Sequence, residues 1–144
     1  MKYIILLLIL GICTYTDIKG KYINMMVVGF GGLVGVVWNV LSGEMTVSAM
    51  LAGMILGVLL LIFSIISKEK IGMGDAMMVI ITGIYLGIRN TTSLVFFSTL
   101  LAGILGMLFI KIKNKEIGYE LPFAPFLFAV YIIGLFATMS GTVS

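Results

Sequence analysis

Long apolar stretches, separated by short polar breaks, constrain the fold of this chain more than any other feature. The 144 residues are 61% hydrophobic and only 10% charged, whereas a typical soluble domain has about 25% charged residues. Apolar stretches of this length are typical of helices that cross a lipid bilayer. The sequence therefore predicts an all-α integral membrane protein that forms a single domain over residues 1–144.

A bundle of about six transmembrane helices is predicted. Their expected bounds are 3–16, 23–41, 47–67, 75–88, 93–110 and 121–139. The turn between the fourth and fifth helices is expected at residues 89–92, where four polar residues follow one another. The first stretch is about 21 Å long as a helix, short for a bilayer core of ~30 Å. It lacks the small-residue cleavage pattern of a signal peptide, so we expect a retained helix.

Lysines gather on one side of the predicted bundle. The breaks after the first, third and fifth helices contain Lys19, Lys21, Lys68, Lys70, Lys111, Lys113 and Lys115. The opposite side has only Lys2 and Arg89. We expect a multi-pass protein of the plasma membrane. Because positive residues accumulate on the cytoplasmic side of membrane proteins, its first, third and fifth helices are expected to end in the cytoplasm. Both termini are then expected outside the cytoplasm.

The residue types present exclude several kinds of site. The chain has no histidine and one cysteine, Cys13. A Ser-His-Asp triad, a Cys-His pair, a His-Glu-x-x-His zinc site and a disulfide within the chain are all excluded. The charge distribution shows no patch of the kind that binds nucleic acid. We expect no metal, no cofactor and no nucleic-acid partner.

Two aspartates, Asp17 and Asp75, each lie at a junction between a charged break and an apolar stretch. Ionisable residues at such places are costly and are frequently functional. The predicted topology places both on the cytoplasmic face, at similar depth. Each carboxylate could simply cap a helix, because it would accept hydrogen bonds from backbone N–H groups. The occurrence of both on one face favours a shared role.

Two neighbouring carboxylates can hydrolyse a peptide bond without histidine, serine, cysteine or a metal. A close pair holds a single proton. The ionised member takes a proton from water, and the protonated member donates a hydrogen bond to the substrate carbonyl. Gly72 and Gly74 precede Asp75. Because they lack a Cβ atom, they allow positive φ and let a substrate backbone pass close to Asp75.

Three motifs follow one another along the chain. Residues 17–19 read Asp-Ile-Lys and are followed by Ile-Asn at 23–24. Residues 72–75 read Gly-Met-Gly-Asp, and residues 122–125 read Pro-Phe-Ala-Pro. In this order they resemble the motifs of the type IV prepilin peptidases, a family of intramembrane aspartyl proteases with a Gly-x-Gly-Asp motif. The order and the predicted topology both match, over nearly the whole chain.

This resemblance implies that Asp17 and Asp75 are the catalytic residues of an aspartic-type endopeptidase. Further residues are candidates for binding the substrate or shaping the site: Gly72, Gly74, Lys19, Glu120, Pro122 and Pro125. The implied substrates are prepilin-like or preflagellin-like precursors, cut at the cytoplasmic membrane face. The chain resembles the short members that lack a region for N-methylation. It departs from the family pattern at three places: Ile23 is followed directly by Asn24 without a proline, Met77 replaces a lysine, and Ala124 replaces a glycine.

Other interpretations remain open from the sequence alone. Asp17 and Asp75 could serve a small ion-coupled transporter or channel as cation or proton sites, although such sites are better placed deep within helices. An inactive relative could act as an assembly scaffold. A Ser-Lys protease using Ser64 or Ser67 is disfavoured. It needs a desolvated lysine as its base, whereas the nearby Lys68 and Lys70 are expected to be solvated.

Several of the 18 glycines recur at four-residue spacing, as in the pairs Gly31/Gly35, Gly53/Gly57 and Gly83/Gly87. Small residues at this spacing let membrane helices approach closely. We interpret them as packing residues.

Overall fold

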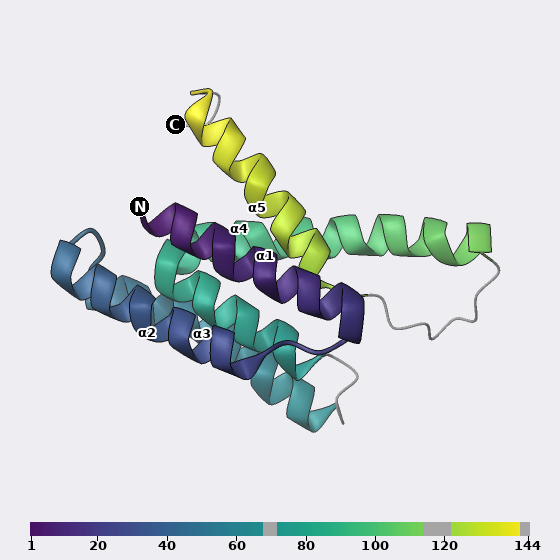
Figure 1. Ribbon diagram of the computed structural model, residues 1–144, viewed down its shortest axis with the longest axis horizontal. Coiled ribbons are helices and arrows are strands. Elements are labelled where there is room, and N and C mark those ends of the chain that lie inside the picture. The colour runs from purple at the N-terminus through teal and green to yellow at the C-terminus, as the bar shows by residue number, and fades with distance from the viewer. Residues whose placement is uncertain (68–71, 114–121, 142–144) are drawn as a thin grey trace.

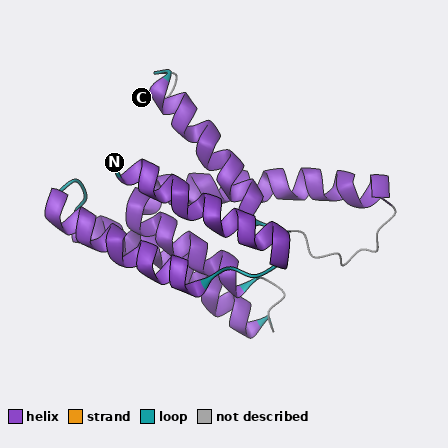
Figure 2. Cartoon of the chain, in the orientation of Figure 1, coloured by secondary structure: helices purple, strands orange, loops and turns teal. Residues whose placement is uncertain are grey.

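The computed structural model describes residues 1–67, 72–113 and 122–141, and most of this part of the chain is helical (Figures 1 and 2). The helices are α1 (Lys2–Gly20), α2 (Met25–Ser42), α3 (Val47–Ile66), α4 (Met73–Lys113) and α5 (Ala124–Met139). The first four are long and apolar enough to cross a membrane, and α5 is a shorter apolar helix. The predicted all-α membrane class is confirmed, whereas the predicted number of six helices is not.

Helix α4 changes direction at Gly87. This residue has φ 73° and ψ 174°, a conformation that glycine adopts far more readily than residues with a Cβ atom. In Figure 1 the first half of α4 (teal) lies among the other helices, and the second half (green) runs back toward the right of the view. The predicted turn at residues 89–92 is wrong, because these residues are helical. The Thr92 hydroxyl donates to the carbonyl of Ile88 within the helix, so its polarity is satisfied without a turn.

Helix α2 attaches to α4 through two hydrogen bonds beside this break. Asn39 Nδ2 donates to the carbonyl oxygen of Ile84 at 2.7 Å, and the Tyr85 hydroxyl donates to that of Gly31 at 2.9 Å. Backbone carbonyls next to an interrupted helix need partners from elsewhere, above all in lipid. The Asn39 amide therefore supports the break at Gly87.

Glycines let α3 and the first half of α4 approach until their backbones touch. A Cβ atom at Gly53 would collide with the carbonyl of Gly83, and one at Gly57 would collide with the backbone nitrogen of Ile80. A Cβ atom at Gly83 would in turn collide with the carbonyl of Gly53. The interpretation of Gly53 and Gly57 as packing residues agrees with these contacts.

The link between α1 and α2 is short and its ends are capped. Helix α1 ends where Lys21 adopts a left-handed conformation, with φ 53°, and its N–H donates to the carbonyl of Asp17 at 2.9 Å. Helix α2 begins after Asn24, whose Oδ1 accepts a hydrogen bond from the N–H of Met26 at 3.0 Å. Asparagine is a preferred residue at this capping position. These caps fix the direction in which the chain leaves Asp17.

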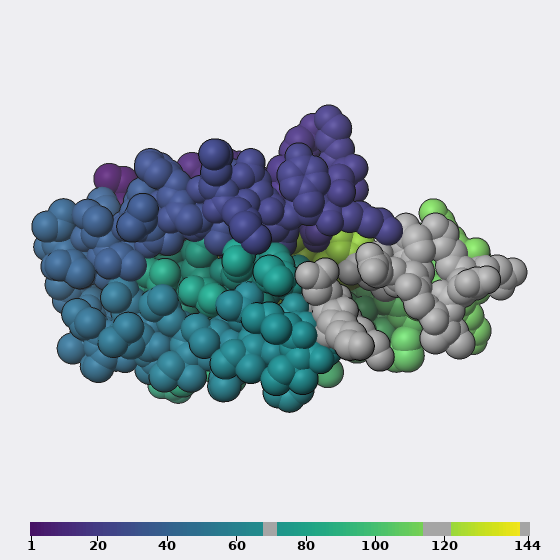
Figure 3. Space-filling model, turned by 90° about the horizontal axis from the view of Figure 1, so that it is seen from below, coloured from purple at the N-terminus to yellow at the C-terminus, as the bar shows by residue number. Residues whose placement is uncertain are grey.

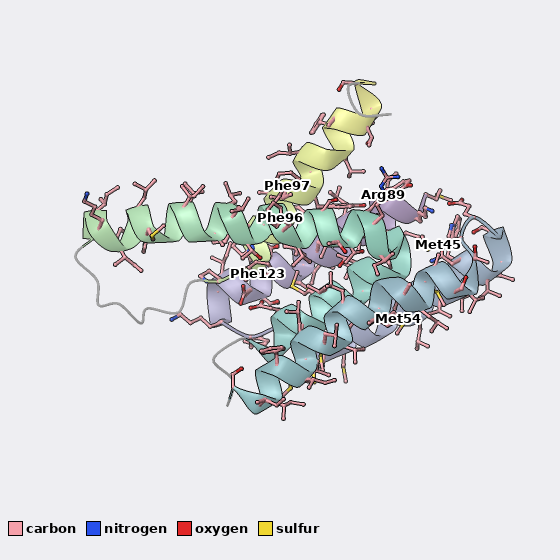
Figure 4. The ribbon with its side chains drawn as sticks, turned by 180° about the vertical axis from the view of Figure 1, so that it is seen from behind. Met45, Met54, Arg89, Phe96, Phe97 and Phe123 are labelled. Carbon is pink, nitrogen blue, oxygen red and sulfur yellow. The ribbon has the colours of Figure 1, made fainter. Side chains whose placement is uncertain are left out.

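The opposite end of the bundle has few charges. Lys2 forms an ion pair of 2.9 Å with Glu44, and the hydrogen bond from Lys2 lowers the pKa of the Glu44 carboxyl. Figure 4 shows Arg89 and Met45 at this end, far from the end of α4 that has Lys111 and Lys113. The lysine-rich ends of α1 and α4 therefore lie away from Lys2 and Arg89.

The glycine contact between α3 and α4 predicts a clear effect of substitution on stability. Gly53→Ala should reduce the free energy of unfolding by about 1–3 kcal/mol, because the added methyl group forces the two backbones apart. Gly103→Ala is the matched control, since Gly103 is helical and has open space around its Cα. Thermal unfolding of both variants in one detergent tests this. Equal unfolding temperatures for Gly53→Ala and the unsubstituted protein would contradict the role of the contact.

Candidate active site

Asp17 lies in the last turn of α1, and its side chain meets the first residue of α5. The N–H of Ala124 donates to Asp17 Oδ2 at 3.3 Å. Asp17 and Ala124 are both buried. The free N–H groups and the dipole of a helix N-terminus favour a negative charge. The start of α5 therefore provides a partner for the Asp17 carboxylate.

Asp75 lies in the first turn of α4, and its carboxylate lies next to Gly72. The backbone N–H groups of Asp75 and Ala76 donate to the carbonyl of Gly72 at 3.1 and 3.3 Å. A Cβ atom at Gly72 would lie 2.9 Å from Asp75 Oδ2, which is closer than such atoms normally approach. The bare Cα of Gly72 therefore leaves room for the Asp75 carboxylate to fold back over the start of its own helix.

Gly74 has a different role from Gly72. A Cβ atom at Gly74 would lie 2.8 Å from Cδ1 of Ile23, which belongs to the link between α1 and α2. The missing side chain allows this link to pack against the start of α4. Gly74 is helical, and neither Gly72 nor Gly74 is among the glycines with positive φ. Gly74 acts by permitting close packing.

Asp17 and Asp75 lie at the ends of two different helices, Asp17 in the last turn of α1 and Asp75 in the first turn of α4. Asp75 lies within range of the charge of Asp17. Two further titratable groups of the described residues lie near Asp17: Cys13, one turn earlier on α1, and Lys21, which lines the same cavity. Asp17 is thus flanked by one acid, one thiol and one amine.

A cavity of about 360 Å³ opens beside Asp17. It lies between the end of α1, the second half of α4 and the start of α5. Its lining residues are Asp17, Ile18, Lys21, Leu105, Phe109, Pro122, Pro125 and Phe126. Figure 3 shows the start of α5 (yellow-green) reaching this face between the end of α1 (dark purple) and the green part of α4. The walls are largely apolar, and Asp17 is the acid among the lining residues.

The remaining predicted site residues fall in three groups. Pro122 and Pro125 line the cavity, and Pro125 lies in the first turn of α5, where the fixed φ of proline suits a helix. Lys19 is exposed on α1, where its Nζ lies 3.4 Å from the Tyr15 hydroxyl, and it does not line the cavity. Glu120 lies outside the described residues.

The contacts also give specific roles to further residues. Thr14 donates a hydrogen bond from Oγ1 to the carbonyl oxygen of Ala124 at 3.3 Å. Phe123 packs against the core, and Figure 4 shows it where α5 meets α1 and α4. Ile23 lies against Gly74. Ile23 and Phe123 lie within the motifs quoted from the sequence, whereas Thr14, a hydroxyl residue within an apolar stretch, has no distinguishing signal and could be found only from its contact.

The site offers acid and base groups. Among the described residues, no group of three or more His, Cys, Asp or Glu side chains gathers to hold a metal ion. Two carboxylates in mutual electrostatic range can provide one proton donor and one proton acceptor. This chemistry suits hydrolysis of a substrate held beside the cavity.

The comparisons with known proteins agree with this arrangement. The sequence model of the type IV leader peptidase family matches residues 4–110. This range includes Asp17 and Asp75 and ends before the start of α5. No curated protein and no solved structure shows a match to the chain. Because the family match covers well over half of the 144 residues, the chain belongs to the type IV leader peptidase family.

Proposed function

We propose that the protein is an intramembrane aspartyl endopeptidase in which Asp17 and Asp75 form the catalytic pair. The observation that carries this proposal is that Asp75, in the first turn of α4, lies within electrostatic range of Asp17, in the last turn of α1. Membership of the leader peptidase family supports peptidase activity. The electrostatic influence of Asp17 on Asp75 supports a shared role for the two residues.

The proposed reaction uses water as the nucleophile. The ionised aspartate removes a proton from water as the water oxygen attacks the carbonyl carbon of the scissile bond. The protonated aspartate donates its proton to the carbonyl oxygen, which gives a neutral tetrahedral diol. Collapse of this diol breaks the C–N bond, and a proton passes from the pair to the leaving amine. A hydroxyl group of the diol gives a proton back to the aspartate pair as the carboxylic acid forms, so the pair again holds one proton and is ready for another cycle.

We propose prepilin-like or preflagellin-like precursors as the substrates. Their leader is short and basic, and an apolar helix follows it, so the scissile bond lies at the membrane surface. The largely apolar cavity beside Asp17 suits the apolar part of such a chain. The lysine-rich ends of α1 and α4 support placing the active site at the cytoplasmic face of the plasma membrane.

Substitution of either aspartate tests the proposal. Asp17→Asn and Asp75→Asn should each remove nearly all cleavage of a co-expressed prepilin, because asparagine keeps the size of the side chain but cannot exchange a proton. The double variant should be scarcely worse, since residues that act as one unit are non-additive. Cleavage is read as a mobility shift of the precursor, and the amount of each variant in the membrane is measured alongside.

Glu44→Gln is the control for this test, because Glu44 is an exposed acid at the opposite end of the bundle. It should cleave at the normal rate. Asparagine also caps helices well. Normal cleavage by Asp17→Asn or Asp75→Asn would therefore rule out the aspartyl mechanism and favour a transporter or scaffold.

Gly72 should position the Asp75 carboxylate. Gly72→Ala places a methyl group against Asp75 Oδ2, and the flexible carboxylate must move. We expect kcat to fall by about 10- to 100-fold, because displacement by ~1 Å has such effects, while thermal stability stays nearly unchanged. Gly29→Ala is the control, since a Cβ atom at Gly29 meets nothing within 4 Å. Unchanged kcat in Gly72→Ala would refute this positioning role.

The pH dependence of cleavage should be bell-shaped. The pair must hold one proton, so activity is lost at low pH when both carboxyl groups are protonated and at high pH when both are ionised. The two limbs belong to the pair and not to either residue. Single-turnover cleavage across the pH range of the folded enzyme measures this profile. A flat profile with chemistry rate-limiting would exclude a shared proton.

A further inference from the structure

Thr14 uses its hydroxyl differently from other threonines of the helices. Thr16, Thr82, Thr92 and Thr99 each donate to a carbonyl oxygen of their own helix, which is the usual arrangement for threonine in a helix. Thr14 Oγ1 instead donates across to the carbonyl oxygen of Ala124 on α5. Both residues are buried. This bond therefore belongs to the contact between two helices.

Thr14 and Asp17 hold the same residue from both sides. Thr14 is bonded to the carbonyl oxygen of Ala124, while Asp17 accepts the N–H of Ala124, each at 3.3 Å. The two α1 residues are three positions apart and so lie on one helix face. Any shift of Ala124 relative to Thr14 therefore moves the hydrogen-bond donor of the Asp17 carboxylate.

Other contacts between α1 and α5 help to fix the register of the two helices, but they lie away from the start of α5. The Tyr131 hydroxyl donates to the carbonyl oxygen of Tyr3 at 3.0 Å. Nearer the middle, Gly11 lies against the ring of Phe128. These contacts define antiparallel helices, yet both lie further along α5 from its start. Among the described residues, Thr14 and Asp17 are the side chains that hydrogen-bond to Ala124 at the start of α5.

We infer that Thr14 is a positioning residue for Asp17, acting through Ala124, the first residue of α5. This inference rests on the proposed function, because it assigns to Thr14 the task of orienting a catalytic carboxylate. Thr14 itself does not line the cavity, so it has no direct contact with the substrate there. Its loss should slow the chemical step and leave substrate binding nearly unchanged.

The test compares substitutions that differ only in the hydroxyl group. Thr14→Val keeps the shape of the side chain and removes the donor, and Thr14→Ser keeps the donor. Thr82→Val is the matched control, because Thr82 is fully buried and its hydroxyl bonds within its own helix to Val79. If Thr14→Val does not accumulate in the membrane, Thr14→Ala tests the same loss. Purified variants are assayed for kcat and KM on a prepilin in detergent.

We expect Thr14→Val to lower kcat about tenfold with KM changed less than twofold, since catalysis depends steeply on position. Thr14→Ser should restore most of kcat, and Thr82→Val should have normal kcat. Normal kcat in Thr14→Val would overturn the inference, as would equal losses in Thr14→Ser and Thr14→Val.

Asp17→Asn separates the two proposals. If it is inactive while Thr14→Val has normal kcat, the role of Thr14 is refuted and the proposed function stands. If Asp17→Asn cleaves normally, the proposed function itself is refuted.

Discussion

The direct backbone contact between α3 and the first half of α4 sets the position from which the site is built. No room exists for a Cβ atom at Gly53, Gly57 or Gly83, so the two helices fit together in one register only. Within a bilayer, where lipid is as apolar as the side chains, such close packing replaces the hydrophobic effect as the force that joins helices. Because α4 begins just before Asp75, this register also fixes the depth of the Asp75 carboxylate.

The two aspartates come from separate pairs of helices. Asp75 belongs to the pair formed by α3 and the first half of α4, and Asp17 belongs to the pair formed by α1 and α5. Ile23, which follows α1, packs on Gly74 at the start of α4 and so joins the two pairs of helices. The bonds from α2 to the region around Gly87 support the same arrangement further along the bundle. The geometry of the site therefore depends on a few contacts that lie outside it.

The sequence was sufficient to predict the parts of this arrangement that depend on polarity. Apolar stretches gave the helical class, and the uneven distribution of lysines placed Asp17 and Asp75 at one end before any contact was known. The change of direction in α4 was mispredicted, because four polar residues at 89–92 are a stronger signal than the single Gly87 that takes the positive φ. The role of Thr14 could not be predicted, since its bond depends on where α5 lies and not on neighbouring residues.

The contact of Asp17 with Ala124 joins residues that leave the ribosome at very different times. Asp17 is synthesised near the beginning of the chain and Ala124 near its end. During translation, α1 is made before α5, so the Asp17 carboxylate at first lacks the hydrogen bond from the N–H of Ala124. Only the insertion of the last helix completes the surroundings of Asp17. The order of synthesis therefore delays completion of the surroundings of Asp17 until α5 has been made.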